Sequence, residues 1–76
     1  MEEKINAILS DVNEELMTYT GNNMVDDEIV DSFELIEIIG QLEDTFDIEI
    51  DAAEVTEENF GNKDRIYCFV KKLIHE

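Results

Sequence analysis

Few side chains in this sequence could perform catalysis. The chain has one histidine, His75, and one cysteine, Cys68. A covalent nucleophile needs a nearby base, most often a histidine, and we expect His75, beside the last residue, to be solvated and without a catalytic role. Cys68 is predicted to lie on the outer face of the last helix, opposite its apolar stripe. We therefore predict that the chain is not an enzyme.

A dedicated metal site is not predicted either. Asp47, Glu49 and Asp51 alternate as the acids of an EF-hand loop do, but that loop also needs a central glycine and a final glutamate. Ala52 stands where the glycine would be required. We expect weak, diffuse binding of divalent cations and no metal site.

Ser32 stands at the start of an apolar strip that is bordered by acidic residues. It begins a predicted helix over residues 31–46, and at 100° per residue Ile36, Gly40 and Phe33 follow it on a narrow strip outside the core face. Acids surround this strip: Glu34, Glu37, Glu43 and Asp44. An apolar strip with a charged rim is typical of a docking surface. The alternative, equally open from periodicity, is that Phe33 and Ile36 fold under the preceding loop and complete the core.

This segment resembles the phosphopantetheine-bearing carrier proteins, which include acyl, D-alanyl and peptidyl carriers. Their signature is Asp-Ser-Leu, then an acid and a helix of alternating apolar and acidic positions, and residues 31–38 read DSFELIEI. Residues 42–50, LEDTFDIEI, are similar to the end of the family's second helix and the turn after it. Acids occupy the family's recognition positions: Asp31, Glu34, Glu37, Glu43, Asp44, Asp47 and Glu49. The resemblance covers nearly the whole chain, including its length and its four-helix layout.

The resemblance implies that Ser32 accepts 4′-phosphopantetheine from coenzyme A. A phosphopantetheinyl transferase would supply the Mg²⁺ and the base, and the arm would carry an acyl or aminoacyl thioester between enzymes of fatty acid, D-alanyl, or peptide and polyketide biosynthesis. The transferase, the loading ligase and the downstream synthases would use basic patches to meet one set of residues. That set is Asp31, Phe33, Glu34, Ile36, Glu37, Glu43, Asp44 and Asp47. The implied protein is a monomeric carrier that acts in the cytoplasm.

Three residues depart from the family pattern, and a second class of function stays open. Phe33 stands in the Leu position of the signature. Gly40 stands where many members carry a bulky apolar residue, and Asp51 replaces a common proline. The cargo and the partner enzymes are not indicated by the sequence. The alternative is an acidic helical interaction module without a prosthetic group, which binds a basic protein or mimics nucleic acid. Such a module would tolerate Ser32→Ala.

The charge balance narrows the possible partners. The chain has 5 Lys and Arg against 21 Asp and Glu, a net charge of −16. Phosphate backbones and anionic membranes would be repelled, so we predict no nucleic acid and no membrane insertion, and instead a basic patch on another protein. One cysteine permits no internal disulfide, and neither a signal peptide nor a long apolar run is evident, which favours a cytosolic protein.

The elements that would position Ser32 are predicted to be helical. A chain of 76 residues allows one domain over 1–76, and we expect an all-α, small antiparallel four-helix bundle with three main helices and one short one. The predicted helices span residues 2–18, 31–46, 54–59 (the short one) and 63–74. Asp31 and Glu34 have the spacing of a capping box, although Ser32 could itself be the N-cap.

Apolar periodicity indicates which side chains form the core. The first helix contributes Ile5, Ile8, Leu9, Val12, Leu16 and Tyr19; the second contributes Leu35, Ile38, Ile39, Leu42 and Phe46; the last contributes Ile66, Phe69, Val70, Leu73 and Ile74. The connection between the first two helices is about a dozen residues long and should be anchored by its apolar side chains, namely Met24, Val25, Ile29 and Val30.

Overall fold

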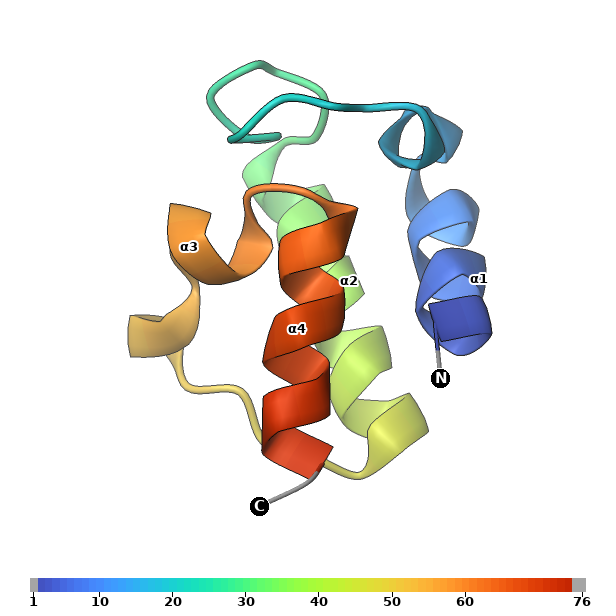
Figure 1. Cartoon of the computed structure of the whole chain (residues 1–76), viewed down its shortest axis with the longest axis vertical. Coiled ribbons are helices and arrows are strands. Elements are labelled where there is room, and N and C mark those ends of the chain that lie inside the picture. The colour runs from blue at the N-terminus through green and yellow to red at the C-terminus, as the bar shows by residue number, and fades with distance from the viewer. Residues whose placement is uncertain (1, 75–76) are drawn as a thin grey trace.

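The structure, a computed structural model, describes residues 2–74, and every regular element among them is helical (Figure 1). His75 lies outside the described residues. Four α-helices and two short 3₁₀ helices follow one another, and no strand is present between residues 2 and 74. They are α1 (Glu2–Val12), η1 (Glu14–Met17), α2 (Ser32–Phe46), η2 (Ala52–Glu54), α3 (Glu57–Phe60) and α4 (Lys63–Ile74). The predicted all-α class is confirmed.

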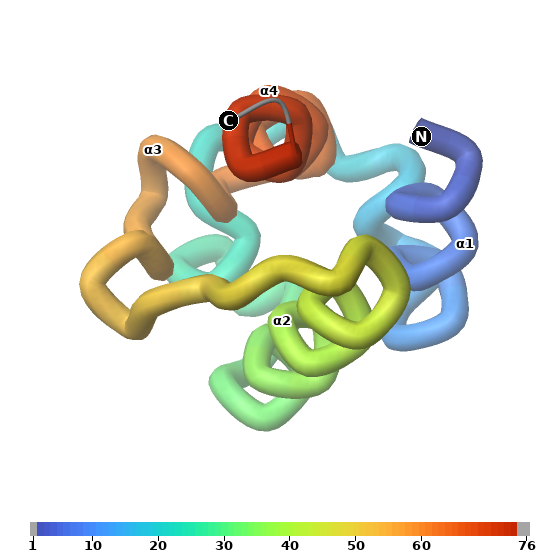
Figure 2. The backbone as a smooth tube through the Cα atoms, turned by 90° about the horizontal axis from the view of Figure 1, so that it is seen from below, coloured from blue at the N-terminus to red at the C-terminus, as the bar shows by residue number. Residues whose placement is uncertain are grey.

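The three long helices do not all alternate in direction. Figure 1 shows α1 running opposite to α2, whereas α2 and α4 run the same way. The segment 47–62, which includes η2 and α3, carries the chain back along the bundle before α4 begins (Figure 1). Seen from below, α3 and α1 lie on opposite sides of α4 (Figure 2). The antiparallel arrangement predicted from the sequence therefore holds for α1 and α2 but not for α2 and α4.

The first helix is shorter than its apolar stripe predicted. It ends at Val12, because the Asn13 side chain accepts a hydrogen bond from the Glu15 N–H at 3.0 Å and caps a new 3₁₀ turn. The Asn13 side-chain amide also donates to the Ile29 carbonyl at 2.7 Å, which ties this break to the following loop. Leu16 is nevertheless buried as predicted, since the 3₁₀ turn keeps it on the core side.

The long loop before α2 is held in place by hydrogen bonds to the start of α4. The Met24 N–H donates to the Gly61 carbonyl at 3.0 Å, and the Asn62 side chain donates to the Gly21 carbonyl at 3.0 Å. Gly61 is required here, because a Cβ would collide with the Asn22 carbonyl. These contacts hold the loop that leads into α2 against the residues at the start of α4.

The core contains most of the predicted side chains. The buried apolar residues are Ile5, Ile8, Leu9, Leu16, Met24, Val30, Ile38, Leu42, Phe60, Ile66, Phe69 and Val70. Two predictions were wrong: Val25 is 37% exposed and Ile74 is 38% exposed. Met24 fills the space beneath the loop, so its neighbour Val25 turns outward, and Ile74 lies in the last turn of α4 at the edge of the bundle.

None of the helices within residues 2–74 combines the length and the apolar character needed to cross a membrane.

Candidate functional site

Ser32 is the first residue of α2, and its side chain is exposed. The N-cap is Asp31, whose carboxylate accepts from the Glu34 N–H at 2.8 Å, while the Glu34 carboxylate accepts from the Asp31 N–H at 3.2 Å. The predicted capping box is thus confirmed with Asp31, not Ser32, as the cap. Among the described residues the Ser32 hydroxyl has no hydrogen-bond partner, so it is free to react with a group brought from outside.

The backbone around Ser32 is suited to an anionic group. The capping box satisfies the Glu34 N–H, and the Leu35 N–H donates to the Asp31 carbonyl at 3.1 Å. The Ser32 and Phe33 N–H groups at the tip of the helix are left to face outward, together with the positive end of the helix dipole. A phosphodiester on the Ser32 oxygen would lie next to these donors.

Phe33 and Ile36 are on the outside of the molecule. Their side chains are 81% and 64% exposed, respectively. The alternative that they fold under the preceding loop is therefore wrong, because that loop is anchored through Met24 and Val30 instead. We call the exposed side of the helix the outer face of α2: Ser32, Phe33, Ile36, Glu37, Gly40 and Asp44.

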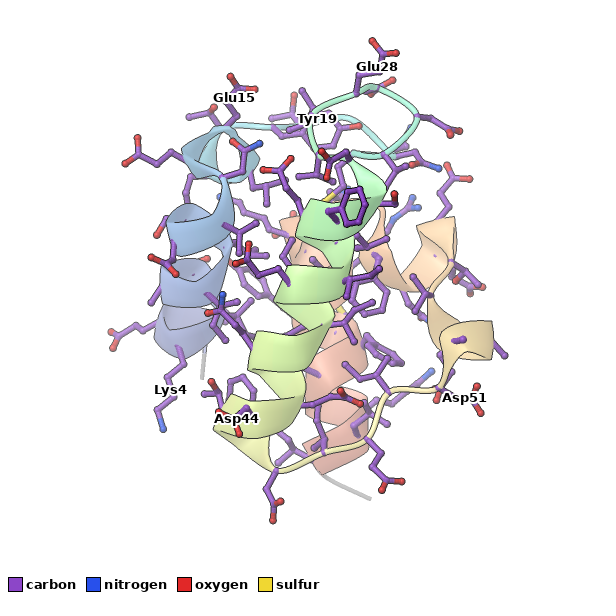
Figure 3. All side chains as sticks on the ribbon, turned by 180° about the vertical axis from the view of Figure 1, so that it is seen from behind. Lys4, Glu15, Tyr19, Glu28, Asp44 and Asp51 are labelled. Atoms are coloured by element: carbon purple, nitrogen blue, oxygen red, sulfur yellow. The ribbon has the colours of Figure 1, made fainter. Side chains whose placement is uncertain are left out.

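The predicted recognition acids divide into two groups. Glu37, Asp44 and Asp47 are exposed, and Figure 3 shows α2 in front of α4, with Asp44 near the C-terminal end of the helix. Asp31 and Glu34 have carboxylates engaged in the cap. The half-buried Glu43 accepts from the Ile50 N–H at 2.8 Å, so it also tethers the chain that leaves α2.

Asp47 ends the helix. Its backbone is left-handed, with a φ of 54°, and its N–H donates to the Glu43 carbonyl. Asp tolerates this conformation better than most residues, because its short polar side chain can bond locally. Asp47 is thus both the C-cap of α2 and an exposed acid at the C-terminal end of the helix.

Gly40 lies in the middle of α2 and is exposed. A Cβ built on it would have no neighbour within 4 Å. Glycine inside a helix is about 1 kcal/mol less favourable than alanine, and no packing contact in the described part of the chain requires it at this position.

An apolar groove begins at Ser32. The sequence pattern did not predict this groove. Its volume is about 340 Å³, and it lies between α2 and the segment that follows it. The groove is lined by Ser32, Leu35, Ile36, Ile39, Ile50, Ala52 and Val55. Leu35 and Ile39 were assigned only to the core, and both are half-buried. The apolar residues after α2, namely Ile50, Ala52 and Val55, are the sequence signal for this groove. Their position in space depends on the path of residues 47–55, which the sequence pattern does not specify.

Other candidate groups are less organised. Cys68 is exposed on α4, as predicted. Within residues 2–74 no cluster of three or more His, Cys, Asp or Glu side chains is arranged to hold a metal ion. Over the same residues the single ion pair joins Lys71 to Glu2 at 3.7 Å, on the surface.

No family model, curated protein or solved structure matches the chain. The resemblance to carrier proteins therefore depends on the sequence features described above and stays a prediction.

Proposed function

We propose that the chain is a carrier protein whose Ser32 hydroxyl accepts 4′-phosphopantetheine from coenzyme A. The observation that carries this proposal is the placement of Ser32: an exposed serine without a hydrogen-bond partner among the described residues, at the N-terminus of a 15-residue helix with an exposed apolar and acidic outer face. When attached, the prosthetic arm supplies a thiol that holds an acyl or aminoacyl group as a thioester. The proposed fold type is that of the carrier proteins.

The chain's own part in the modification is to present the Ser32 oxygen. That oxygen forms a bond to the pantetheine-side phosphorus of coenzyme A, the bond from this phosphorus to the bridging oxygen breaks, and adenosine 3′,5′-bisphosphate leaves. The hydroxyl proton passes to a base of the transferase, which also supplies Mg²⁺. Asp31 keeps the helix tip ordered during this step, because its carboxylate caps the Glu34 N–H and leaves the Ser32 hydroxyl unengaged.

The groove beside Ser32 supports a role for the apolar part of a cargo. It lies within reach of a flexible arm attached to Ser32, and its lining contains no charged side chain. Removing apolar surface from water is favourable by about 25 cal/mol per Å², so an acyl chain gains from entering this groove. A cargo with an apolar chain suits the lining better than a charged one.

The outer face of α2 supports recognition by basic enzymes. Phe33 and Ile36 provide apolar contact area, and the exposed Glu37 and Asp44 stand beside them. The segment 32–46 has no Lys or Arg, so its charged side chains are all negative and would steer a basic patch towards the outer face of α2.

The proposal is tested by the intact mass after incubation with coenzyme A and a phosphopantetheinyl transferase. Ser10 and Ser32 are the two serines of the chain, so Ser10→Ala is a matched control for Ser32→Ala. Ser10 lies within α1, and its hydroxyl bonds to the Ala7 carbonyl at 3.4 Å. We expect wild type and Ser10→Ala to gain one phosphopantetheine and Ser32→Ala to gain none. Modification of Ser32→Ala would contradict the proposal, because the group would then be attached to another residue. Modification of no variant would also contradict it, and would favour an interaction module without a prosthetic group.

A further inference from the structure

No contact among residues 2–74 explains the glycine in the middle of α2. Gly40 is exposed, a Cβ on it would have no neighbour within 4 Å, and its conformation is an ordinary helical one. Alanine would favour the helix more. Because packing within the described structure does not explain the missing side chain, we look for its explanation in a partner.

The surroundings of Gly40 indicate the kind of surface that approaches it. On a helix, residues three and four apart are neighbours, and for Gly40 these are the exposed Ile36 and Glu37 on one side and Glu43 and Asp44 on the other. Gly40 therefore forms a shallow depression on the surface of α2, between an exposed apolar side chain and several carboxylates. A partner that fits it carries a protruding apolar side chain with Lys or Arg around it.

An enzyme that acts on Ser32 has a contact area large enough to include Gly40. The two residues are eight positions apart on one helix, which corresponds to about 12 Å along its axis. A standard protein interface buries about 800 Å² on each partner, equivalent to a disc with a radius of about 16 Å. A contact centred on Ser32 thus extends past Gly40.

We propose that Gly40 is a specificity-determining position, and that it receives a bulky apolar side chain, ringed by basic residues, of the transferase that modifies Ser32. This inference rests on the proposed carrier function. The apolar side chain would pack against the exposed backbone of α2 beside Ile36, and the basic residues would meet Glu37 and Asp44. A side chain at position 40 would occupy the space that the partner needs.

The test compares three substitutions on α2 in the full chain. Gly40→Ala adds one methyl group, Gly40→Leu adds a bulky side chain, and Thr45→Leu places the same bulk at an exposed position of α2 off the outer face. Circular dichroism gives the thermal midpoint. Mass spectrometry gives kcat and KM for modification by the transferase of the same organism with coenzyme A.

We expect both Gly40 variants to melt about 4–8 °C higher than wild type, because they remove the helix penalty of glycine. Gly40→Leu should raise the KM for the chain about tenfold or more, as overpacking of a fitted contact does, with kcat close to wild type. Gly40→Ala should have a smaller effect on KM, and Thr45→Leu should leave KM unchanged.

Three other outcomes would contradict either the inference about Gly40 or the carrier function. A wild-type KM for Gly40→Leu would overturn the inference and leave the carrier function intact. A lower thermal midpoint for both Gly40 variants would mean that the glycine serves the fold, which also overturns the inference. A wild-type chain that is never modified would remove the carrier function and the inference with it.

Discussion

Substitution can separate the capping role of Asp31 from the recognition role that the proposed function gives it. Its carboxylate caps α2 through the Glu34 N–H at 2.8 Å, and under the proposed function its charge also meets a basic partner. Asp31→Ala removes both the cap and the charge, whereas Asp31→Ser removes the charge but keeps an oxygen that can cap. Loss of an N-cap side chain costs about 1 kcal/mol of stability. The Glu34 N–H is exposed, which lets water satisfy part of the lost bond and argues against a much larger value.

The size of this effect makes it measurable. For a domain of 60–100 residues, 1 kcal/mol corresponds to roughly 4–8 °C in thermal midpoint. We expect Asp31→Ala to melt lower by that amount and Asp31→Ser to melt within about 2 °C of wild type, because serine and aspartate are similar N-caps. Thermal unfolding followed by circular dichroism, with urea midpoints as a second measure, checks both values.

The same pair reports on recognition. If the charge of Asp31 contributes to docking, Asp31→Ser should slow phosphopantetheine transfer although its fold is intact. Two results would refute the reasoning about the cap: an Asp31→Ala protein as stable as wild type, or an Asp31→Ser protein destabilised as much as Asp31→Ala. Glu34→Gln is a suitable companion, since its amide oxygen can still accept from the Asp31 N–H.

Three further predictions concern charge. Stability should rise with salt, because a net charge of −16 on 76 residues repels itself in the folded state. The thermal midpoint should increase up to about 0.2 M monovalent salt, since the Debye length is already only about 10 Å at 0.1 M, and it should increase again with millimolar Mg²⁺. A midpoint independent of salt would contradict this. Reversing Glu37 and Asp44 together to Lys should slow modification of Ser32, mainly by slowing association with the transferase. The effect should be modest, since each exposed pair contributes only about 0.2–1 kcal/mol, and should become smaller in high salt. Equal rates for this variant and wild type in low salt would show that these acids do not meet the transferase. Burial raises the pKa of Tyr67 above its ordinary value of 10.0, against the opposing effect of its hydrogen bond to Asn6. Its contribution to stability is complete below pH 10 and is lost as the pH rises through the folded-state pKa, so Tyr67→Phe should show a shallower loss of stability above pH 10 than wild type, and identical pH profiles would argue against it.

Local patterns predicted the ends of α2 and α4 well. The spacing of Asp31 and Glu34 located the start of α2, since a capping box is formed by residues three apart and requires no distant contact. The apolar stripe and the Gly61-Asn62 break gave the range of α4, and Asn62 does cap the helix by accepting from the Arg65 N–H at 3.0 Å. These features are set by neighbours in the sequence.

Features that depend on distant segments were not predictable in the same way. The stripe of the first helix continued past Asn13, but the side chain of that residue bonds locally and to the Ile29 carbonyl, which ends α1 at Val12. Periodicity likewise could not decide whether Phe33 is covered, because that depends on where the loop 18–31 is anchored. The tether from Glu43 to Ile50 and the groove beside Ser32 both require the path of residues 47–55, which no short-range pattern specifies.

The central claim is that the Ser32 oxygen becomes covalently bound to phosphopantetheine. The most direct measurement is fragmentation mass spectrometry of the wild-type chain after incubation with coenzyme A and transferase, which assigns any added mass to one residue. The account predicts a single phosphopantetheine on the fragment that contains Ser32 and none on the fragment that contains Ser10. An unmodified chain, or an added group located on any residue other than Ser32, would contradict it.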